Sequence, residues 1–200
     1  MDTGRLSGVL IRNHEELQWL MEIGYQGQYI ADYMLYTWNK KAVSLYQKLV
    51  SRATVPVELN KKEILQLGCE KEKELLLYGR LPLMYSANCL QKTLGKCLLE
   101  NTKKQHTYTL TDRYKNHFPV VQNCIHCYNI LYNTVPMSLH GQIQSLLQEK
   151  FAVYRLDFSL ESREETHAVL QYYSTVWKKE DANKFPIADF TNGHYKRGVE

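Results

Sequence analysis

Four cysteines are the residues whose type and spacing most directly suggest chemistry. Cys124 and Cys127 form a Cys-Ile-His-Cys pair, and Cys89 and Cys97 stand earlier in the chain. Two residues between paired cysteines allow a tight turn to direct both sulfurs at one metal. Four thiolates suit Zn²⁺ or an iron–sulfur cluster. The sequence therefore predicts one metal site on these cysteines, with unrelated buried cysteines as the alternative.

The spacing of the first two cysteines bears on the identity of the metal. Cys89 and Cys97 are eight positions apart, which is wide for a zinc site built from two close pairs. The spacing favours a cluster, and zinc stays the alternative. His126 lies inside the second pair and could replace a ligand, although a solvent-facing loop histidine is the simpler interpretation. We expect the fifth cysteine, Cys69, not to be a ligand.

Composition limits the class of protein. The chain has 200 residues, of which 44% are hydrophobic, and this suits one domain with a sizeable core. An odd number of cysteines argues against a disulfide framework. We find no apolar stretch long enough for a membrane span and no signal-peptide pattern, so we expect a cytoplasmic protein without a membrane partner. The net charge of +4 permits nucleic-acid binding without requiring it.

Apolar runs alternate with helical patterns along most of the chain. A helix is expected over 14–23, two more after Asn39 and Asn60, another over 139–149, and a last one over 162–178, opened by a Ser162–Glu165 capping box. Six strands are expected, over 8–13, 29–33, 54–59, 74–79, 129–133 and 151–158. This alternation predicts an α/β fold with about six parallel strands, a partial TIM-like (β/α) barrel.

Polar residues follow several of these strands. The carboxyl ends of parallel strands form the active face of such folds. Glu58 is the candidate general acid or base. The candidates for substrate binding are Asn13, Asn39, Asn60 and Arg80. For the asparagines, helix capping is an equally good explanation.

The alternation of strand and helix is interrupted over 85–128. We interpret this segment as an inserted, cysteine-rich β-hairpin subdomain. Two β-like runs, 107–111 and 118–122, flank a predicted turn over 112–116. Barrel units are expected over 5–84 and 129–178, followed by a tail over 179–200. The insert also carries basic and tyrosine side chains that suit either RNA contact or a solvated hairpin, namely Lys103, Lys104, Tyr108, Arg113, Tyr114 and Lys115.

Several segments resemble, in order, those of peptidase family U-thirty-two, the collagenase-like peptidases. The most specific is Glu-Leu-Leu-Leu-Tyr-Gly-Arg-Leu-Pro-Leu-Met over 74–84. Others are Asp32-Tyr33, Asn39, 57–60, 86–89, 112–114, 118–120, 124–129, 132–133 and the ending over 189–200. The resemblance covers essentially the whole chain.

The resemblance implies a TIM-like barrel and an iron–sulfur cluster, of the 4Fe–4S type, on Cys89, Cys97, Cys124 and Cys127. Family members begin upstream, so the chain is expected to be a C-terminal portion. Its partners would be the missing N-terminal part or another copy at the open barrel edges, besides a protein or RNA substrate.

Three functions follow from the resemblance and from the residues. The first is cluster-dependent modification, a hydroxylation of RNA or of a small molecule. The second is the peptidase (hydrolase) activity for which the family is named. The third is a non-catalytic, zinc-stabilised fragment. No phosphate-binding loop, nucleophile elbow or His-Glu-x-x-His motif is present to decide among them.

Overall fold

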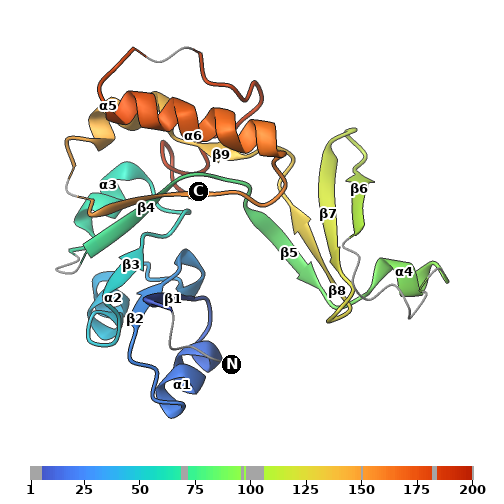
Figure 1. Ribbon diagram of the computed structural model, residues 1–200, viewed down its shortest axis with the longest axis horizontal. Coiled ribbons are helices and arrows are strands. Elements are labelled where there is room, and N and C mark those ends of the chain that lie inside the picture. The colour runs from blue at the N-terminus through green and yellow to red at the C-terminus, as the bar shows by residue number, and fades with distance from the viewer. Residues whose placement is uncertain are drawn as a thin grey trace.

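The computed structural model describes residues 6–68, 72–95, 97, 106–149, 151–181 and 184–199. Within these ranges the chain forms a mixed α/β structure with two sheets (Figure 1). The larger is a curled parallel sheet that forms a half-barrel of five strands. In spatial order these are β1 (Gly8–Ile11), β2 (Gln28–Ala31), β3 (Arg52–Thr54), β4 (Glu72–Gly79) and β10 (Val153–Asp157).

Three helices connect the first four strands, a fourth follows β10, and polar side chains fix where each of them begins. The connecting helices are α1 (His14–Glu22), α2 (Lys40–Tyr46) and α3 (Lys61–Gln66), with the 3₁₀ turn η1 (Tyr33–Leu35) after β2, and α6 (Arg163–Trp177) follows β10. The predicted capping box is confirmed, because Ser162 and Glu165 each accept the other's backbone N–H. The strand–helix alternation of the first half is likewise confirmed.

The prediction of a sixth parallel strand over 129–133 is wrong. That segment is β8 (Tyr128–Tyr132), which lies antiparallel between two strands of the smaller sheet. The four-residue turn before it returns the chain directly beside β7, and so short a connection can join only antiparallel neighbours. The position beside the end of β4 is taken by a short antiparallel strand, β9 (Met137–Ser138).

Two other predicted elements are shorter than expected. The strand predicted over 54–59 ends at Thr54, and Pro56 beyond it has no N–H to give to a ladder. The helix predicted over 139–149 is a 3₁₀ turn, η3 (His140–Gln142), followed by α5 (Ile143–Leu146).

The hydrophobic core lies between the half-barrel and its helices. On β4, Leu75 and Leu77 are buried in one cluster with Val169 and Val176 of α6. A second cluster joins β1 and β2 to α1 and α2 and includes Ile11, Leu17, Ala31 and Tyr46. The apolar side chains recur at strand and helix spacing, which is why these faces pack together.

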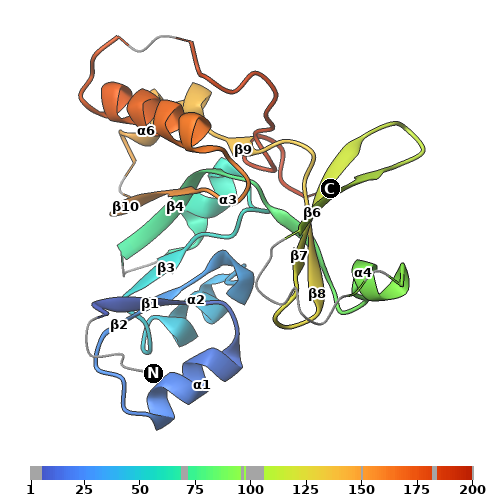
Figure 2. The ribbon, with the colours of Figure 1, turned by 45° about the vertical axis from the view of Figure 1, so that its right-hand side comes forward.

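The smaller sheet extends to one side of the half-barrel (Figures 1 and 2). Its order is β5 (Pro82–Ser86), β8, β7 (His117–Asn123) and β6 (His106–Thr111), all antiparallel. The predicted turn over 112–116 is confirmed, and the Asp112 carboxylate accepts the N–H groups of Tyr114 and Asn116. No described residue of these four strands belongs to either hydrophobic core cluster.

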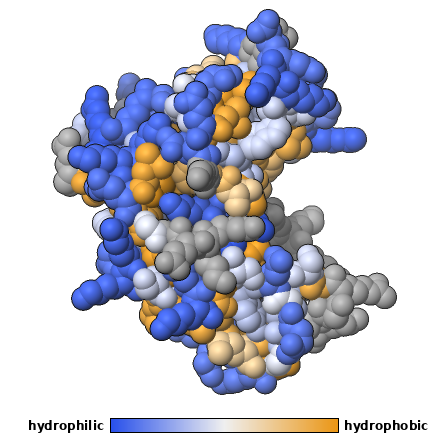
Figure 3. Space-filling model, turned by 90° about the vertical axis from the view of Figure 1, so that its left-hand side faces the viewer, coloured by the Kyte–Doolittle hydropathy of each residue, from blue (hydrophilic) through white to orange (hydrophobic). Residues whose placement is uncertain are grey.

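The outer surface is mixed in character. Figure 3 shows hydrophobic residues dispersed among hydrophilic ones on the face that it presents. Among the described residues, every helix is too short or too polar to cross a membrane.

Candidate functional site

A cavity of about 140 Å³ lies where the parallel strands end; we call it the strand-end cavity. Arg12 follows β1, Tyr33 follows β2, Arg80 follows β4 and Asp157 ends β10, while the smaller sheet closes the cavity. Six polar or aromatic side chains of its lining matter here: Arg12, Tyr33, Arg80, Tyr85, Tyr132 and Asp157. The carboxyl ends of the strands thus form a cavity, as expected for a parallel α/β fold.

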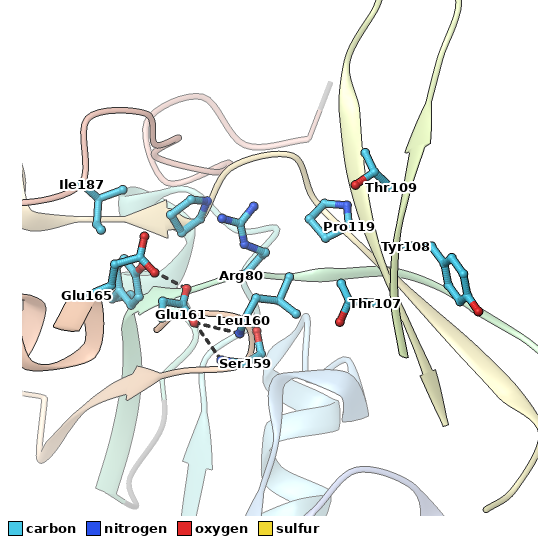
Figure 4. A pocket seen from close by; sticks show the side chains of 12 residues that line it. Arg80, Thr107, Tyr108, Thr109, Pro119, Ser159, Leu160, Glu161, Glu165 and Ile187 are labelled. Carbon is cyan, nitrogen blue, oxygen red and sulfur yellow. Dashed lines mark hydrogen bonds between the residues drawn. The ribbon is translucent and has the colours of Figure 1, made fainter. Parts of the chain in front are cut away.

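A larger space of about 590 Å³, the inter-sheet cleft, separates the β6–β7 hairpin from the start of α6 (Figure 4). Arg80 lines both the cleft and the strand-end cavity. Glu161, also in the cleft, accepts the Tyr78 hydroxyl at 3.0 Å and the N–H groups of Ser159 and Leu160. Because both of its oxygens are engaged, Glu161 serves the local loop rather than a ligand.

A chain of alternating charges runs across the interior of the half-barrel. Arg155 of β10 donates to Asp32 at 2.9 Å and pairs with Glu74 of β4 at 3.2 Å. Arg12 also binds Asp32, at 3.1 Å, and Arg52 pairs with Glu74 at 3.4 Å. Since buried charges are costly without partners, the alternation stabilises each of them.

Sequence reasoning missed this network as part of the site. Asp32 and Arg155 are 123 positions apart, and only the curl of the sheet brings them together. A signal was present in the sequence, because Arg155 lies between apolar residues of a predicted strand and Glu74 directly precedes a run of three leucines. Charges at such positions need partners, although the pattern alone does not identify them.

The predicted substrate-binding asparagines cap helices in this structure. Asn13 accepts the N–H of Glu16, Asn39 accepts two N–H groups of α2, and Asn60 forms a capping box with Glu63. Their side-chain oxygens therefore accept the free backbone N–H groups at the N-termini of α1, α2 and α3.

Among the predicted binding residues, Asn60 lines a pocket beside α3. Arg80 lines both the strand-end cavity and the inter-sheet cleft. Its guanidinium donates to the carbonyl oxygens of Asn133 and Thr134, at 2.9 Å and 2.5 Å. Glu58 lines neither the strand-end cavity nor the inter-sheet cleft, and its buried Oε2 has no hydrogen-bond partner within the described ranges. Its role as a general acid or base stays a prediction.

The smaller sheet positions the cysteines at one of its ends. The register pairs Ser86 of β5 with Asn129 of β8, so Cys89, three residues beyond, approaches the turn that holds Cys124 and Cys127. Asn129 reinforces this approach by donating to the Asn88 carbonyl oxygen at 2.6 Å. The short helix α4 (Leu90–Thr93) begins directly after Cys89 and leads towards Cys97. Cys97 lies close enough to Cys124 to affect it electrostatically.

The other three cysteines affect Cys124 electrostatically. Burial raises the pKa of Cys124, and negative charge on Cys89, Cys97 and Cys127 raises it further. Each of the other three cysteines therefore lies within range of the charge on Cys124. The described residues contain no group of three or more Cys, His, Asp or Glu that could hold a metal ion, so the four sulfurs do not form a coordination shell in this structure. Cys69, Lys103 and Lys104 fall outside the described residues.

Two features distinguish Cys89 and its surroundings. Cys89 is buried, and its sulfur accepts the side-chain N–H of the fully buried Gln122 at 2.9 Å. This hydrogen bond fixes the position of the Cys89 sulfur beside β7. On the same sheet, the Tyr85 and Tyr128 rings lie 6.4 Å apart, and they connect the cysteine turn with the strand-end cavity.

Comparisons with protein-family models, with curated proteins and with solved structures gave no significant match to this chain.

Proposed function

We propose that the chain is part of an iron–sulfur enzyme that modifies its substrate by hydroxylation, with the cluster on Cys89, Cys97, Cys124 and Cys127. The substrate, RNA or a small molecule, would enter at the strand-end cavity. A cluster of the 4Fe–4S type would supply one-electron redox chemistry. Zinc at the same cysteines is the alternative, and it would leave a structural module without redox function.

The observation that carries this proposal is the approach of three cysteine charges to Cys124. Four sulfurs from one chain match the ligand count of a cluster or a zinc site. The hydrogen bond from Gln122 to Cys89 supports the same assignment, because N–H donors to ligand sulfurs stabilise their charge and tune the metal. The residue types match the ligands of the proposed group, and ligation would need the four thiolates to move closer together than they lie in this structure.

The smaller sheet supplies a second argument for a metal. Its four strands contribute no described residue to the core clusters, and it exposes large apolar side chains such as Leu83, Met84 and Leu110. Among the described residues of its strands, Val120 and Val121 are the buried apolar side chains, so this small sheet gains little from hydrophobic burial. Metal ligation at its end is a known way to stabilise so small a unit.

A peptidase reaction receives less support. Ser138 lies 2.9 Å from His140, the distance at which a base activates a serine. However, Ser138 is fully buried and also hydrogen-bonds the Tyr173 hydroxyl, so a peptide bond has no access to it. Gelatin or peptide cleavage by the protein, abolished by Glu58→Ala, would restore the peptidase alternative.

An RNA substrate is favoured by the tip of the β6–β7 hairpin. Tyr114 is 70% exposed, and the Arg113 guanidinium lies 4.7 Å from the centre of its ring. Lys115 follows in the same turn. An exposed aromatic ring with flanking cations suits base stacking and phosphate contact. Affinity for single-stranded RNA that falls steeply with salt and with Tyr114→Ala would support this partner.

We also propose that the half-barrel belongs to a TIM-like barrel. The outer strands β1 and β10 each pair on one side only within the described residues. Open parallel edges invite further strands, either from an upstream part of the same protein or from a second copy. Light scattering of the chain at several concentrations tests this, and a monomer at every concentration would argue against a second copy.

Metal analysis tests the central proposal. Protein purified without oxygen is expected to contain iron and sulfide and to absorb visible light, and Cys124→Ser is expected to lose both signals. Cys69→Ser is the matched control and should retain them. Stoichiometric zinc without iron would establish the structural alternative, and protein without either metal would refute the assignment.

A further inference from the structure

The charge chain of the half-barrel ends at the strand-end cavity. In order it reads Arg52, Glu74, Arg155, Asp32 and Arg12. Arg12, the last member, lines the cavity and has 48% of its side chain exposed there and to solvent. Its guanidinium uses only Nε for Asp32, and its two terminal nitrogens have no acceptor among the described residues.

A second guanidinium enters the same cavity with unused capacity. Arg80 is held by two carbonyl oxygens at one terminal nitrogen, and these contacts fix its position. Its Nε is buried without a hydrogen-bond partner in the part of the chain that the structure describes. A buried guanidinium N–H without an acceptor carries a cost that a bound anion would remove.

Three tyrosines complete the lining. The hydroxyls of Tyr33, Tyr85 and Tyr132 make no hydrogen bond to any described residue. Burial raises the pKa of each of these hydroxyls, which therefore stay protonated at neutral pH and can donate. The cavity thus presents donors from two arginines and three tyrosines.

We infer that the strand-end cavity binds an oxyanion, the carboxylate or phosphate of a small molecule, between Arg12 and Arg80 with the tyrosine hydroxyls as further donors. This inference rests on the proposed role of the cavity as the substrate site, and it names the chemical class of that substrate. Guanidinium groups match both oxyanions in geometry, and charge-assisted hydrogen bonds are the strongest available to a protein.

The volume of the cavity and the charge of Asp157 restrict the class of ligand further. A volume of about 140 Å³ holds the equivalent of roughly five water molecules, enough for an oxyanion on a small carbon skeleton. Asp157 also lines the cavity and repels an anion at its own position. The oxyanion therefore lies on the arginine side, and Asp157 is left to accept a hydrogen bond from a hydroxyl of the same molecule.

Calorimetric titration of the full chain with inorganic phosphate and with succinate tests the inference and distinguishes the two anion chemistries. Saturable binding of at least one anion is expected. Arg12→Gln and Arg80→Gln are each expected to weaken it about tenfold or more, because each removes a charged donor. Arg163→Gln, an exposed arginine of α6, is the matched control and should bind as the unchanged protein does.

Tyr85→Phe tests the same cavity without removing a charge, so the inference stays testable if an arginine variant misfolds. It removes one hydroxyl from a partly exposed ring and is expected to weaken binding about threefold. Circular dichroism establishes that each variant is folded. The inference is overturned if neither anion saturates, if both arginine variants bind normally, or if Arg163→Gln weakens binding equally. Displacement by single-stranded RNA at equal phosphate concentration would assign the cavity to a nucleic-acid backbone instead.

Metal content of the same variants keeps the two proposals separate. Iron should be unchanged in the arginine and tyrosine variants. Cys124→Ser should lose iron and bind the anion more weakly but still saturably, because Arg12 and Arg80 follow strands of the half-barrel whereas Tyr85 and Tyr132 belong to the smaller sheet. Anion binding without any metal would refute the cluster alone. Iron without anion binding would refute the cavity assignment alone.

Discussion

The two sheets of this protein are stabilised in different ways. The half-barrel buries Leu75 and Leu77 against α6 on one face and carries a paired charge network on the other. The smaller sheet shares in neither core cluster and is held by its ladders, by the Asp112 turn and by contacts around Cys89. Buried apolar area dominates folding free energy, so the half-barrel is expected to be the more stable region.

This difference indicates a division of roles. The stable half-barrel supplies fixed positions for Arg12, Arg80 and Asp157 at its strand ends. The smaller sheet brings the cysteines together and closes the cavity with Tyr85 and Tyr132. A sheet without a core depends on its ligands, so metal binding and cavity shape are expected to be coupled in it.

The largest expected effect is that of removing the proposed metal from the smaller sheet. Cys124→Ser, or chelation of the wild-type protein, should abolish hydrogen-exchange protection of β5 to β8 and leave β1 to β4 protected. Structural metal sites contribute on the order of 10 kcal/mol of folding free energy, far more than this sheet gains from burial. Equal exchange in the smaller sheet with and without metal would contradict the division proposed above, and Cys69→Ser is the control.

The second expected effect concerns the half-barrel. Asp32→Ala leaves Arg155 and Arg12 without their shared buried partner and should cost about 3–5 kcal/mol of unfolding free energy in urea titration. Glu149→Ala is the control, because Glu149 pairs with Lys61 near the surface and such pairs contribute about 0–1 kcal/mol. Similar losses of unfolding free energy in both variants would show that the interior charge network contributes no more to stability than the surface pair.

A smaller effect is expected at the start of α6. Ser162→Ala removes the side-chain acceptor of the Glu165 N–H and should lower the free energy of unfolding by about 1 kcal/mol. Ser174→Ala, at an exposed position within the same helix, should be neutral or slightly stabilising. The prediction fails if the two serine variants unfold at the same urea concentration.

The smallest effect is a pH dependence confined to the hairpin tip. The Asn116 side-chain amide, together with backbone N–H groups, lowers the pKa of Asp112 below its usual value of 3.8. A depressed pKa means that the folded turn favours the carboxylate. Its stabilisation is therefore present above the unfolded pKa and is lost as pH falls through the folded one.

Amide exchange of Tyr114 and Asn116 measures this loss. Protection, measured relative to the intrinsic exchange rate at each pH, should fall as the pH drops below about 4, the ordinary pKa of an aspartate. Asp112→Asn should remove the pH dependence while retaining part of the turn, because asparagine also accepts hydrogen bonds. An acid transition that persists in Asp112→Asn would place its origin elsewhere.

Much of the fold could be predicted from the sequence because many elements depend on near neighbours. The Ser162–Glu165 box and the caps at Asn39 and Asn60 act over two or three residues, so their helices begin where predicted. The hairpin around Asp112 was predictable for the same reason. The segment over 129–133 was assigned to the wrong sheet, because an apolar run of five residues does not show which strand it will pair with.

The candidate site was predictable in part. The residue types of the cysteines and the position of Arg80 after a strand were visible in the sequence, and the structure places Arg80 at two cavities. The asparagines could not be assigned, because capping and substrate binding require the same side chain at the same place. The tyrosines of the cavity come from a sheet whose placement only the folded chain reveals.

The sequence by itself determined the alternation of strand and helix in the first half of the chain and the starts of the capped helices. Each of these depends on residue identity and short-range hydrogen bonding. Only the tertiary structure decided that Arg155 reaches Asp32, that β8 joins the smaller sheet, and that Arg12 and Arg80 share one cavity. The physical reason is that a guanidinium or a strand edge accepts any complementary partner, and the packing of the whole chain selects which one it meets.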